Sequence, residues 1–394
     1  MGDFQICIFL RDVIVELVNL TLLFLSLFIK RDDKKIMFGA WMGEKVADNP
    51  RYLMEYIQKN HPEYKCYWVI NSLDNEYVQK YNDVVFVKQN SLKQLLAALG
   101  CKYFFTSHPL YGDICRYNNA WRGAQTVFLG HGACLKKVRP YYYSFPFKYI
   151  VTHNEIEENI LKDYKVISDS NSALKLGEPR NDYLINADSA ERERVKRLFA
   201  EKFSFSPDKT IITYMPTFRK HGAEIKSLFE YGEKSKELLN FLKENNCVMV
   251  EKFHRTSMML DSFVKTENVD DVIVNIDNSV ETQELLLITD ILICDYTSAI
   301  ADYALTGNKA LFYVYDYDFY KDEDQGLNFT IDEYSYGPVV YDFENFTSEL
   351  KKLILSDKSE FTERRQEVIN RMLPFDKGDS CKKIFEKVIL NNDN

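Results

Sequence analysis

The stretch TDILICDYTSAIADYALTGNKALFYVYDY, residues 289–317, decides the fold of this chain. Its first part, Asp290–Cys294, predicts a short buried strand, which is followed by a two-residue turn. Residues Thr297–Leu305 then predict a helix, and Ala310–Val314 predict a second buried strand. The repeating unit of the fold is therefore a strand, a helix and a further strand.

The predicted helix begins with two hydroxyl residues, Thr297 and Ser298, at the end of a strand. The first N–H groups of a helix have no partner within it, and the helix dipole adds partial positive charge, so this position can bind phosphate. In the alternative interpretation, one hydroxyl only caps the helix. Asp302 lies one turn beyond Ser298 on the same helix face, where it could accept hydrogen bonds from a ligand or be an ordinary surface carboxylate.

Short strand-like runs alternate with helical patterns along most of the chain. The runs lie at 36–41, 66–70, 84–88, 103–107, 126–130 and 149–153, and again at 210–215, 247–253, 272–276, 291–295 and 310–314. Such alternation predicts an α/β protein with parallel sheets covered by helices. A charged helical segment near residues 186–209 separates the two series. We therefore expect two Rossmann-like domains, at 34–185 and 186–375, preceded by a helix at 1–33 and followed by a C-terminal helix and tail at 376–394.

The composition limits the kinds of ligand. The chain has 394 residues and a net charge of −9, so a general nucleic-acid surface is excluded, and any anionic ligand must meet local cations. Eight cysteines are scattered without the spacing of a zinc site. This distribution favours free thiols in a reducing cytoplasm.

The N-terminal segment 4–29 is mostly apolar and is followed by the charged run KRDDKK. Charged residues interrupt it, so it does not predict a spanning helix. On a helical wheel the polar residues fall in one arc: Gln5, Asp12, Glu16, Asn19 and Ser26. This pattern predicts an amphipathic helix in a membrane interface, with the lysines and arginine near anionic headgroups. The alternative is a helix that packs against the protein or a partner subunit.

Cations and hydroxyls follow four of the predicted strands and the segment SALKLG. They are His131, Lys136, Lys137 and Arg139; Arg180; Thr217, Arg219 and Lys220; Lys252, His254 and Arg255; and Thr297 and Ser298. Ligands of open α/β sheets bind beyond the carboxyl ends of the strands. We therefore expect a cleft between the domains that holds a nucleotide with two phosphates.

Several motifs together resemble the CDP-glycerol glycerophosphotransferase family, which makes teichoic acids and related phosphate-linked capsules. They are HGACLKK, LGEPRND, YMPTFR, KFH, CDYTSAIADYAL, FYVYDYDFY and YGPVVYD, in that order between residues 36 and 375. The resemblance implies a GT-B arrangement of two Rossmann-like domains facing a cleft. It also implies monotopic attachment to the cytoplasmic face of the plasma membrane. The implied reaction is transfer of glycerol phosphate or another alditol phosphate from a CDP-activated donor to a membrane-linked acceptor, with release of CMP.

The resemblance also implies the site residues. His131 and His254 would be the catalytic pair, and the donor would contact Gly132, Ala133, Cys134, Leu135, Arg180, Pro216, Thr217, Lys252, Phe253, Thr297, Ser298 and Asp302. The sequence departs from the family pattern at Ala133, where threonine is common, and at Arg255, where proline is common. Both differences bear on the identity of donor and acceptor more than on the reaction.

The residues themselves suggest how such a transfer would run. A neutral histidine can take the proton of the attacking hydroxyl, which makes His131 the expected base, although a structural role in a glycine turn is the alternative. His254 and Lys252 would offset charge on the phosphoryl oxygens, unless they form a solvated surface turn. Arg180 and Arg219 suit phosphate binding, or they could form interdomain ion pairs. The other histidines receive no role.

No metal or other cofactor is required by this chemistry, because cations supply the compensating charge. Asp316 and Asp318 follow a strand, but their acidic, aromatic surroundings indicate a loop near the cleft. The expected partners are CDP-glycerol or a similar CDP-alditol, a lipid-linked glycan acceptor, the membrane surface and a second copy in a homo-oligomer. Two other functions stay open: a GT-B glycosyltransferase that uses a nucleotide sugar, and a non-catalytic membrane scaffold.

Overall fold

The computed structural model describes residues 2–137, 147–163, 167, 173–220, 225, 227–253, 269, 271–277, 279–357 and 360–391, with side chains from residue 12 onward. The chain forms two compact units. The first contains residues 1–131, 139–182 and 375–394, and the second contains residues 132–138 and 183–374. The chain thus passes between the units within the HGACLKK motif.

The first unit contains a seven-stranded sheet in the order β3-β2-β1-β4-β5-β6-β7, in which every pair is parallel. Its strands are β1 (Asp32–Gly39), β2 (Lys65–Ile70), β3 (Val85–Lys88), β4 (Cys101–Thr106), β5 (Gln125–Phe128), β6 (Tyr149–Val151) and β7 (Ala173–Leu174). Its helical elements are α1 (Gly2–Ser26), η1 (Trp41–Gly43), α2 (Asp48–Asn60), α3 (Glu76–Lys80), α4 (Leu92–Gly100), α5 (Leu110–Asp113), η2 (Asn118–Ala120), α6 (Glu155–Asp163), α17 (Ser380–Ile384) and η5 (Phe385–Leu390). Helix α7 (Pro179–Asn186) begins in this unit and ends in the next.

The second unit contains a six-stranded parallel sheet in the order β10-β9-β8-β11-β12-β13. Its strands are β8 (Thr210–Met215), β9 (Cys247–Lys252), β10 (Ile273–Ile276), β11 (Ile291–Cys294), β12 (Lys309–Tyr313) and β13 (Val339–Val340). Its helices are α8 (Ser189–Phe203), α9 (Glu233–Glu244), α11 (Thr282–Ile288), α12 (Ala299–Ala304), α13 (Tyr317–Asp322), α14 (Ile331–Tyr334), α15 (Phe343–Leu355) and α16 (Thr362–Met372).

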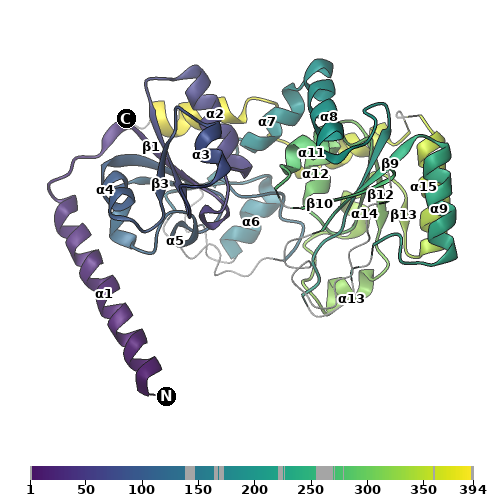
Figure 1. Ribbon diagram of the computed structural model, residues 1–394. Coiled ribbons are helices and arrows are strands. Elements are labelled where there is room, and N and C mark those ends of the chain that lie inside the picture. The colour runs from purple at the N-terminus through teal and green to yellow at the C-terminus, as the bar shows by residue number, and fades with distance from the viewer. Residues whose placement is uncertain are drawn as a thin grey trace. The chain divides into compact units, whose positions relative to one another are not determined.

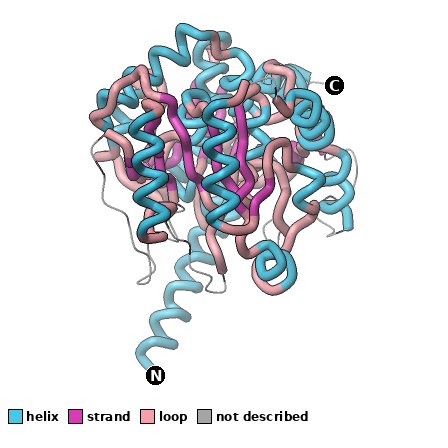
Figure 2. The backbone as a smooth tube through the Cα atoms, turned by 90° about the vertical axis from the view of Figure 1, so that its right-hand side faces the viewer, coloured by secondary structure: helices cyan, strands magenta, loops and turns pink. Residues whose placement is uncertain are grey.

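Helices cover both faces of the second sheet because its strands are apolar on both sides. In β11, Leu292 and Cys294 belong to one hydrophobic cluster, and Ile291 and Ile293 belong to another. The second cluster also contains apolar residues of α9 and α15, which lie along the same face of the sheet (Figure 1). Figure 2 looks toward this face, with helices in front of the strands. This arrangement confirms the α/β class with parallel sheets.

Each sheet reverses its strand order at one point. In the first unit the order turns outward in both directions from the β1–β4 pair, and in the second it does so from the β8–β11 pair. Loops that leave such a pair diverge to opposite sides, which opens a crevice at the carboxyl ends of the strands. The two crevices are the places where each unit is expected to bind a ligand.

The predicted strands are confirmed, with ends that differ by one to a few residues. The stretch that decides the fold forms β11, α12 and β12, although α12 is shorter than the predicted helix Thr297–Leu305. Two short strands, β7 and β13, were not among the predicted runs. Both contain only two residues, which is too short for a periodic signal.

Helix α1 has a different apolar pattern from the one expected. Val18, Leu22 and Leu25 pack against the core of the first unit, and Asn19 of the expected polar arc is also buried. A second apolar stripe is 39–74% exposed and consists of Val13, Ile14, Leu17, Leu20 and Phe24, continued after the helix by Leu27 and Phe28. Figure 1 shows α1 extending away from the sheet of its unit. In the described part of the chain, none of the helices combines the length and apolar content that a membrane span needs.

The C-terminal segment packs on the first unit through the LGEPRND motif. Gly177 has a left-handed φ of 78°, and a Cβ there would lie 2.5 Å from the Ser380 hydroxyl, so only glycine fits. The carboxylate of Asp182 accepts the backbone N–H groups of Ser380 and Cys381 at 2.9 and 2.8 Å. The Oδ1 atom of Asp376 accepts the backbone N–H of Glu178 at 3.0 Å. These hydrogen bonds attach the C-terminal segment to the rest of the first unit.

We predict that Asp376→Asn stabilises the protein at pH 8. Burial, together with the nearby charge of Glu178, raises the pKa of Asp376 from 3.8 to about 7. The folded state thus binds more protons than the unfolded state between pH 4 and 7, and stability falls as the pH rises through this window. The amide cannot ionise, so its free energy of unfolding at pH 8 should exceed that of the wild type by roughly 1–3 kcal/mol.

Urea unfolding at pH 4.5 and pH 8 measures this effect. The difference between the two proteins should shrink at pH 4.5, where both side chains are neutral. Asp74→Asn, at an exposed position, is the control and should leave the pH dependence unchanged. A variant that is equally stable or less stable than the wild type at pH 8 would contradict the assignment.

Candidate functional site

His131 lies just beyond the end of β5, in the first unit. Its Nδ1 atom is 3.1 Å from the backbone carbonyl oxygen of Ser107, which follows β4. A carbonyl oxygen only accepts hydrogen bonds, so the neutral ring carries its proton on Nδ1. The Nε2 atom is then the basic nitrogen, and the residue is exposed. This geometry leaves Nε2 as the nitrogen that can accept a proton.

The surroundings of His131 keep the ring neutral. The pKa of His131 is lowered to about 4, first because the dense protein around it displaces water, and then because of the neighbouring His108 ring. The Asp48 carboxylate acts in the opposite direction, and the Arg180 guanidinium adds to the lowering. At neutral pH the imidazole is therefore unprotonated and able to accept a proton, even though its surface remains open to solvent.

Asn49 fixes the backbone that precedes His131. Its side-chain amide donates to the carbonyl oxygens of Leu129 and Gly130, both at 3.1 Å. Its Oδ1 atom accepts the backbone N–H of Arg180 at 3.0 Å. Gly130 has a φ of 72°, which favours glycine. One buried amide thus connects α2, the end of β5 and the start of α7.

Arg180 belongs to a buried network of charges in the first unit. Its guanidinium donates to Glu178 at 2.9 Å and to Asp48 at 3.0 Å. His153, for which the sequence predicted no role, lies 2.5 Å from the other oxygen of Glu178 and also contacts Glu157. Burial opposes the charge on His153, but the two carboxylates outweigh it and raise its pKa well above 6.5. The network supports the turn that carries His131.

In the second unit, Asp295 joins the ends of β8 and β11. Its carboxylate accepts the backbone N–H of Thr217 at 2.9 and 3.0 Å and the Thr217 hydroxyl at 2.6 Å. Arg219 makes an ion pair with Asp295 at 2.9 Å and donates to Asp316 at 2.6 and 3.0 Å. The crevice of this unit is therefore built around one carboxylate and one guanidinium.

Arg219 is only 1% exposed and lies over the rings of Tyr296, Tyr315 and Tyr320, at 4.9, 5.7 and 4.9 Å. This environment explains Asp316, which the sequence placed in a loop near the cleft: it is a partner of Arg219. The arginine holds β8, β11 and the segment after β12 together. A direct contact between Arg219 and phosphate stays a prediction.

The segment after His131 packs on the second unit. Asn328 donates its side-chain amide to the carbonyl oxygens of Cys134 and Lys136 at 3.0 and 2.9 Å. Its backbone N–H donates to the carbonyl oxygen of Leu135 at 2.8 Å. Ala133 and Leu135 are buried in the hydrophobic cluster of this unit. The backbone of the motif is thus fixed by contacts within the second unit.

Lys136 lies near the buried pair Asp295 and Arg219. Burial lowers its pKa, Asp295 raises it and Arg219 lowers it. Among the described residues, no ion pair or hydrogen bond of its ammonium group is recorded, whereas Arg219 is bound to two carboxylates. Lys136 is therefore one described cation near this site that could receive a ligand.

The remaining expected residues of the second unit have these positions. Pro216 follows β8 and is buried, and Phe253 packs edge-on against Tyr214. The ammonium group of Lys252 donates a hydrogen bond to the Val280 carbonyl oxygen at 2.7 Å. The carboxylate of Asp302 accepts a hydrogen bond from the Gln283 side-chain amide at 3.0 Å. Ser298 stands at the start of α12 without a side-chain capping bond, and Thr297 accepts only a long 3.4 Å bond from Ala299. Their hydroxyls are therefore not explained by helix capping. Ligand contacts by these residues stay predictions.

Some expected residues lie outside the described residues, namely His254, Arg255 and Arg139. Within the described ranges, histidine, cysteine and carboxylate side chains form no group of three or more that could hold a metal ion. The sequence analysis missed Asp48, Asn49 and Asp295. Asn49 stands 80 residues from Leu129, and Asp48 stands 132 residues from Arg180, so no local signal reports these contacts.

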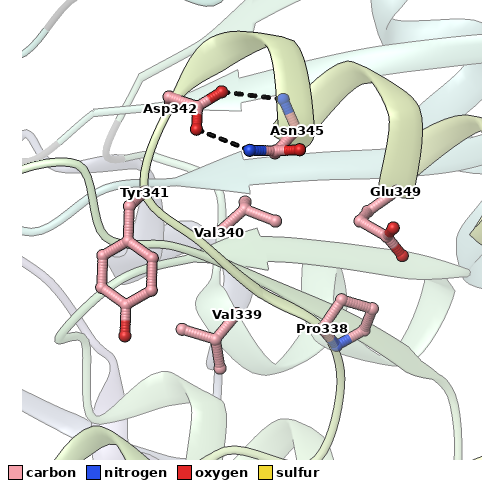
Figure 3. Close-up of a pocket in the computed structure, with 7 residues that line it drawn as sticks. All are labelled: Pro338, Val339, Val340, Tyr341, Asp342, Asn345 and Glu349. Carbon is pink, nitrogen blue, oxygen red and sulfur yellow. Dashed lines mark hydrogen bonds between the residues drawn. The ribbon is translucent and has the colours of Figure 1, made fainter.

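A shallow pocket of the second unit lies at the edge strand β13 (Figure 3). It is lined by Pro338, Val339, Val340, Tyr341, Asp342, Asn345 and Glu349. Asp342 accepts two hydrogen bonds from Asn345 and caps α15, so its charge is already engaged. This lining contains none of the expected site residues.

Residues 21–390 match the family described as CDP-Glycerol:Poly(glycerophosphate) glycerophosphotransferase. A teichoic acid poly(glycerol phosphate) polymerase of Bacillus spizizenii is 25% identical over 396 residues, which cover 96% of this chain and 98% of that protein. A teichoic acid glycerol-phosphate primase of the same organism is 32% identical over 317 residues, which cover 72% of this chain and 78% of the primase. Of two longer relatives, the match covers about half.

The fold is also similar to a solved structure of the wall teichoic acid polymerase TagF. The TM-score is 0.75 at 24% identity, and the match covers 91% of this chain and 89% of that chain. This likeness supports the GT-B-like class of the fold.

Proposed function

Because this chain belongs to the CDP-glycerol:poly(glycerophosphate) glycerophosphotransferase family, we propose that it transfers glycerol phosphate from CDP-glycerol to a hydroxyl group of a teichoic acid acceptor. The acceptor oxygen forms a bond to the phosphorus that carries glycerol, and the bond from that phosphorus to CMP breaks. The hydroxyl proton moves to the enzyme. The products are CMP and a new phosphodiester.

The observation that supports this proposal most directly is the tautomer of His131. The Ser107 carbonyl holds the Nδ1 proton, so the Nε2 atom can take the proton of the acceptor hydroxyl as the new bond forms. The pKa of about 4 belongs to the protein without ligand. Two bound phosphates bring negative charge, which raises the pKa of a nearby histidine and strengthens the base when the donor is present.

We expect His131→Ala to lose about 10²–10⁴-fold in the rate of acceptor-dependent CMP release, which is the usual contribution of a general base. The measurement is CMP release from CDP-glycerol, with and without a lipid-linked teichoic acid acceptor. His61→Gln is the matched histidine control, because His61 follows α2 at the opposite edge of the sheet.

The assay also separates the other readings. Release of UDP from a sugar donor, with no CMP from CDP-glycerol or CDP-ribitol, would replace this proposal by a glycosyltransferase. No turnover with any donor would favour a scaffold. We propose that no metal takes part, and activity that disappears with a chelator and returns with a divalent cation would contradict that part.

Lys136 is proposed as a cation for the donor phosphates. In an acidic protein an anionic donor needs local positive charge. The guanidinium groups of Arg180 and Arg219 are engaged by buried carboxylates. The Lys136 ammonium stands near the crevice between β8 and β11, where Thr297 and Ser298 begin the next helix. A lysine at this position binds phosphate as a point charge.

We expect Lys136→Met to raise the KM for CDP-glycerol about 10–100-fold, because a charge-assisted contact contributes about 1.5–3 kcal/mol. Lys137→Met is the control: it removes the same charge one residue later, where the side chain is exposed and packs over Gly326. Equal KM values for the two variants would contradict a specific role of Lys136.

Attachment of α1 to a membrane surface is the proposed basis of peripheral localisation and of access to a lipid-linked acceptor. The exposed apolar stripe covers about 140° of a helical wheel drawn at about 100° per residue. The opposite side of α1 packs on its own unit, so the stripe remains for the lipid. Lys30 and Lys34 follow the helix and would lie near anionic headgroups.

We predict that Leu17→Gln combined with Phe24→Gln weakens binding to anionic vesicles about 100-fold or more, since each buried large apolar side chain contributes about 1.5–3 kcal/mol. Cosedimentation of the full chain with the vesicles measures this binding. Asp12→Asn combined with Glu16→Gln changes the polar side of the same helix and should not weaken it. Undiminished binding of the first variant would contradict the assignment of the stripe.

A further inference from the structure

The ring of His108 stacks on that of His131. The ring centroids are 4.8 Å apart and the planes differ by 12°. The two residues follow neighbouring strands, β4 and β5, which pair in parallel register. His108 is therefore part of the immediate surroundings of the expected base, although the sequence analysis gave it no role.

Asp113 holds His108 in place. One carboxylate oxygen of Asp113 accepts the backbone N–H groups of His108 and Ser107 at 2.8 and 3.1 Å. The other oxygen accepts the backbone N–H of Met42 at 2.9 Å and lies 3.6 Å from Nδ1 of His108. The Ser107 hydroxyl is 3.0 Å from the same Nδ1. One fully buried carboxylate thus fixes both the backbone and the ring of His108.

The loop after β1 also contacts the ring of His108. The Trp41 ring meets the His108 ring edge-on, with the centroids 5.5 Å apart. Trp41 and Met42 have left-handed φ values of 48° and 54°. Such conformations cost about 1–2 kcal/mol per residue and persist only where the surroundings impose them. The strained loop therefore follows from the packing around His108.

The charges around the two rings differ. His108 faces Asp113, Asp48 and Lys45; burial lowers its pKa, but the Asp113 carboxylate leads the groups that raise it above 6.5 on balance. His131 faces His108, Asp48 and Arg180 and has no ion pair with Asp113. Of the two stacked rings, His108 is therefore the one whose surroundings favour the protonated form.

We propose that His108 is a positioning residue for His131: its stacked ring fixes the plane of the base, and its protonated form, which the Asp113 carboxylate favours, disfavours protonation of the base. This inference rests on the proposed function of His131. His108 keeps its own proton throughout the transfer, and the only proton that moves passes from the acceptor hydroxyl to Nε2 of His131.

Two substitutions separate the parts of this role. His108→Phe keeps an aromatic ring for stacking and removes the charge, whereas His108→Ala removes both. Removal of a nearby positive charge raises the pKa of a histidine, so the titration of His131 should move upward by about one pH unit in both variants. NMR spectra of the histidine rings in the full-length protein measure this titration without substrate. His61→Phe is the control and should leave it unchanged.

Kinetics test the stacking. At pH 8, where His131 is neutral in every variant, His108→Ala should lower kcat about tenfold through loss of orientation, and His108→Phe should retain most of it. The pH at which kcat/KM falls on the acid side should rise in both. A merely structural role would leave this pH profile unmoved.

The outcomes are distinguishable. An unshifted His131 titration in both variants would overturn the role of the charge, and equal kcat values for the Phe and Ala variants would overturn the role of the ring. If His108→Ala does not fold, the Phe variant alone still tests the charge. If the wild type releases no CMP from CDP-glycerol, the proposed function fails, while the NMR titration still decides whether His108 controls His131.

Discussion

The parallel arrangement of the strands is the constraint on which the site depends. In a parallel sheet all carboxyl ends lie at one edge, and the loops that leave them must share that edge. Each sheet of this protein reverses its order once, at β1–β4 and at β8–β11. Residues that surround the candidate site stand at these points: His108 follows β4, and Asp295 follows β11. The topology alone therefore gathers residues that are far apart in the sequence.

Buried charges hold these loops in place. Arg180 and Arg219 are bound by pairs of carboxylates, and His153 is bound by Glu157 and Glu178. Removing one partner of such a pair leaves a charge without compensation in the interior, which typically costs about 3–5 kcal/mol. Arg180 and Arg219 thus stabilise the loops through these ion pairs. The proposed role of Lys136 differs from theirs, because its ammonium group would bind the ligand directly.

The fold was predictable because its signal is local. Runs such as Ile291–Cys294 and Ala310–Val314 are apolar on both faces, which is characteristic of a parallel strand between helices. The same reasoning predicted a helix for α1 but not which of its apolar sides contacts the protein, because a wheel distinguishes polar from apolar positions but not one apolar surface from another. Val18 and Leu22 contact the protein core, whereas Leu17 and Phe24 are exposed. Only the packing partner separates these sets, and the sequence of the helix does not contain it.

The sequence motifs name the candidate residues but not the groups that surround them. His131 and Thr217 stand where the motifs place them, yet the groups that define their state come from distant segments: Ser107 sets the tautomer of His131, and Asp295 binds the hydroxyl of Thr217. His108 shows the same limit, since a lone histidine after a strand carries no signal until its ring is found against another ring. A base can be named from its motif, but its proton affinity is a property of the neighbours that the fold supplies. The proton affinity of His131 therefore depends on the loops after β1 and β4 as much as on the motif that contains His131.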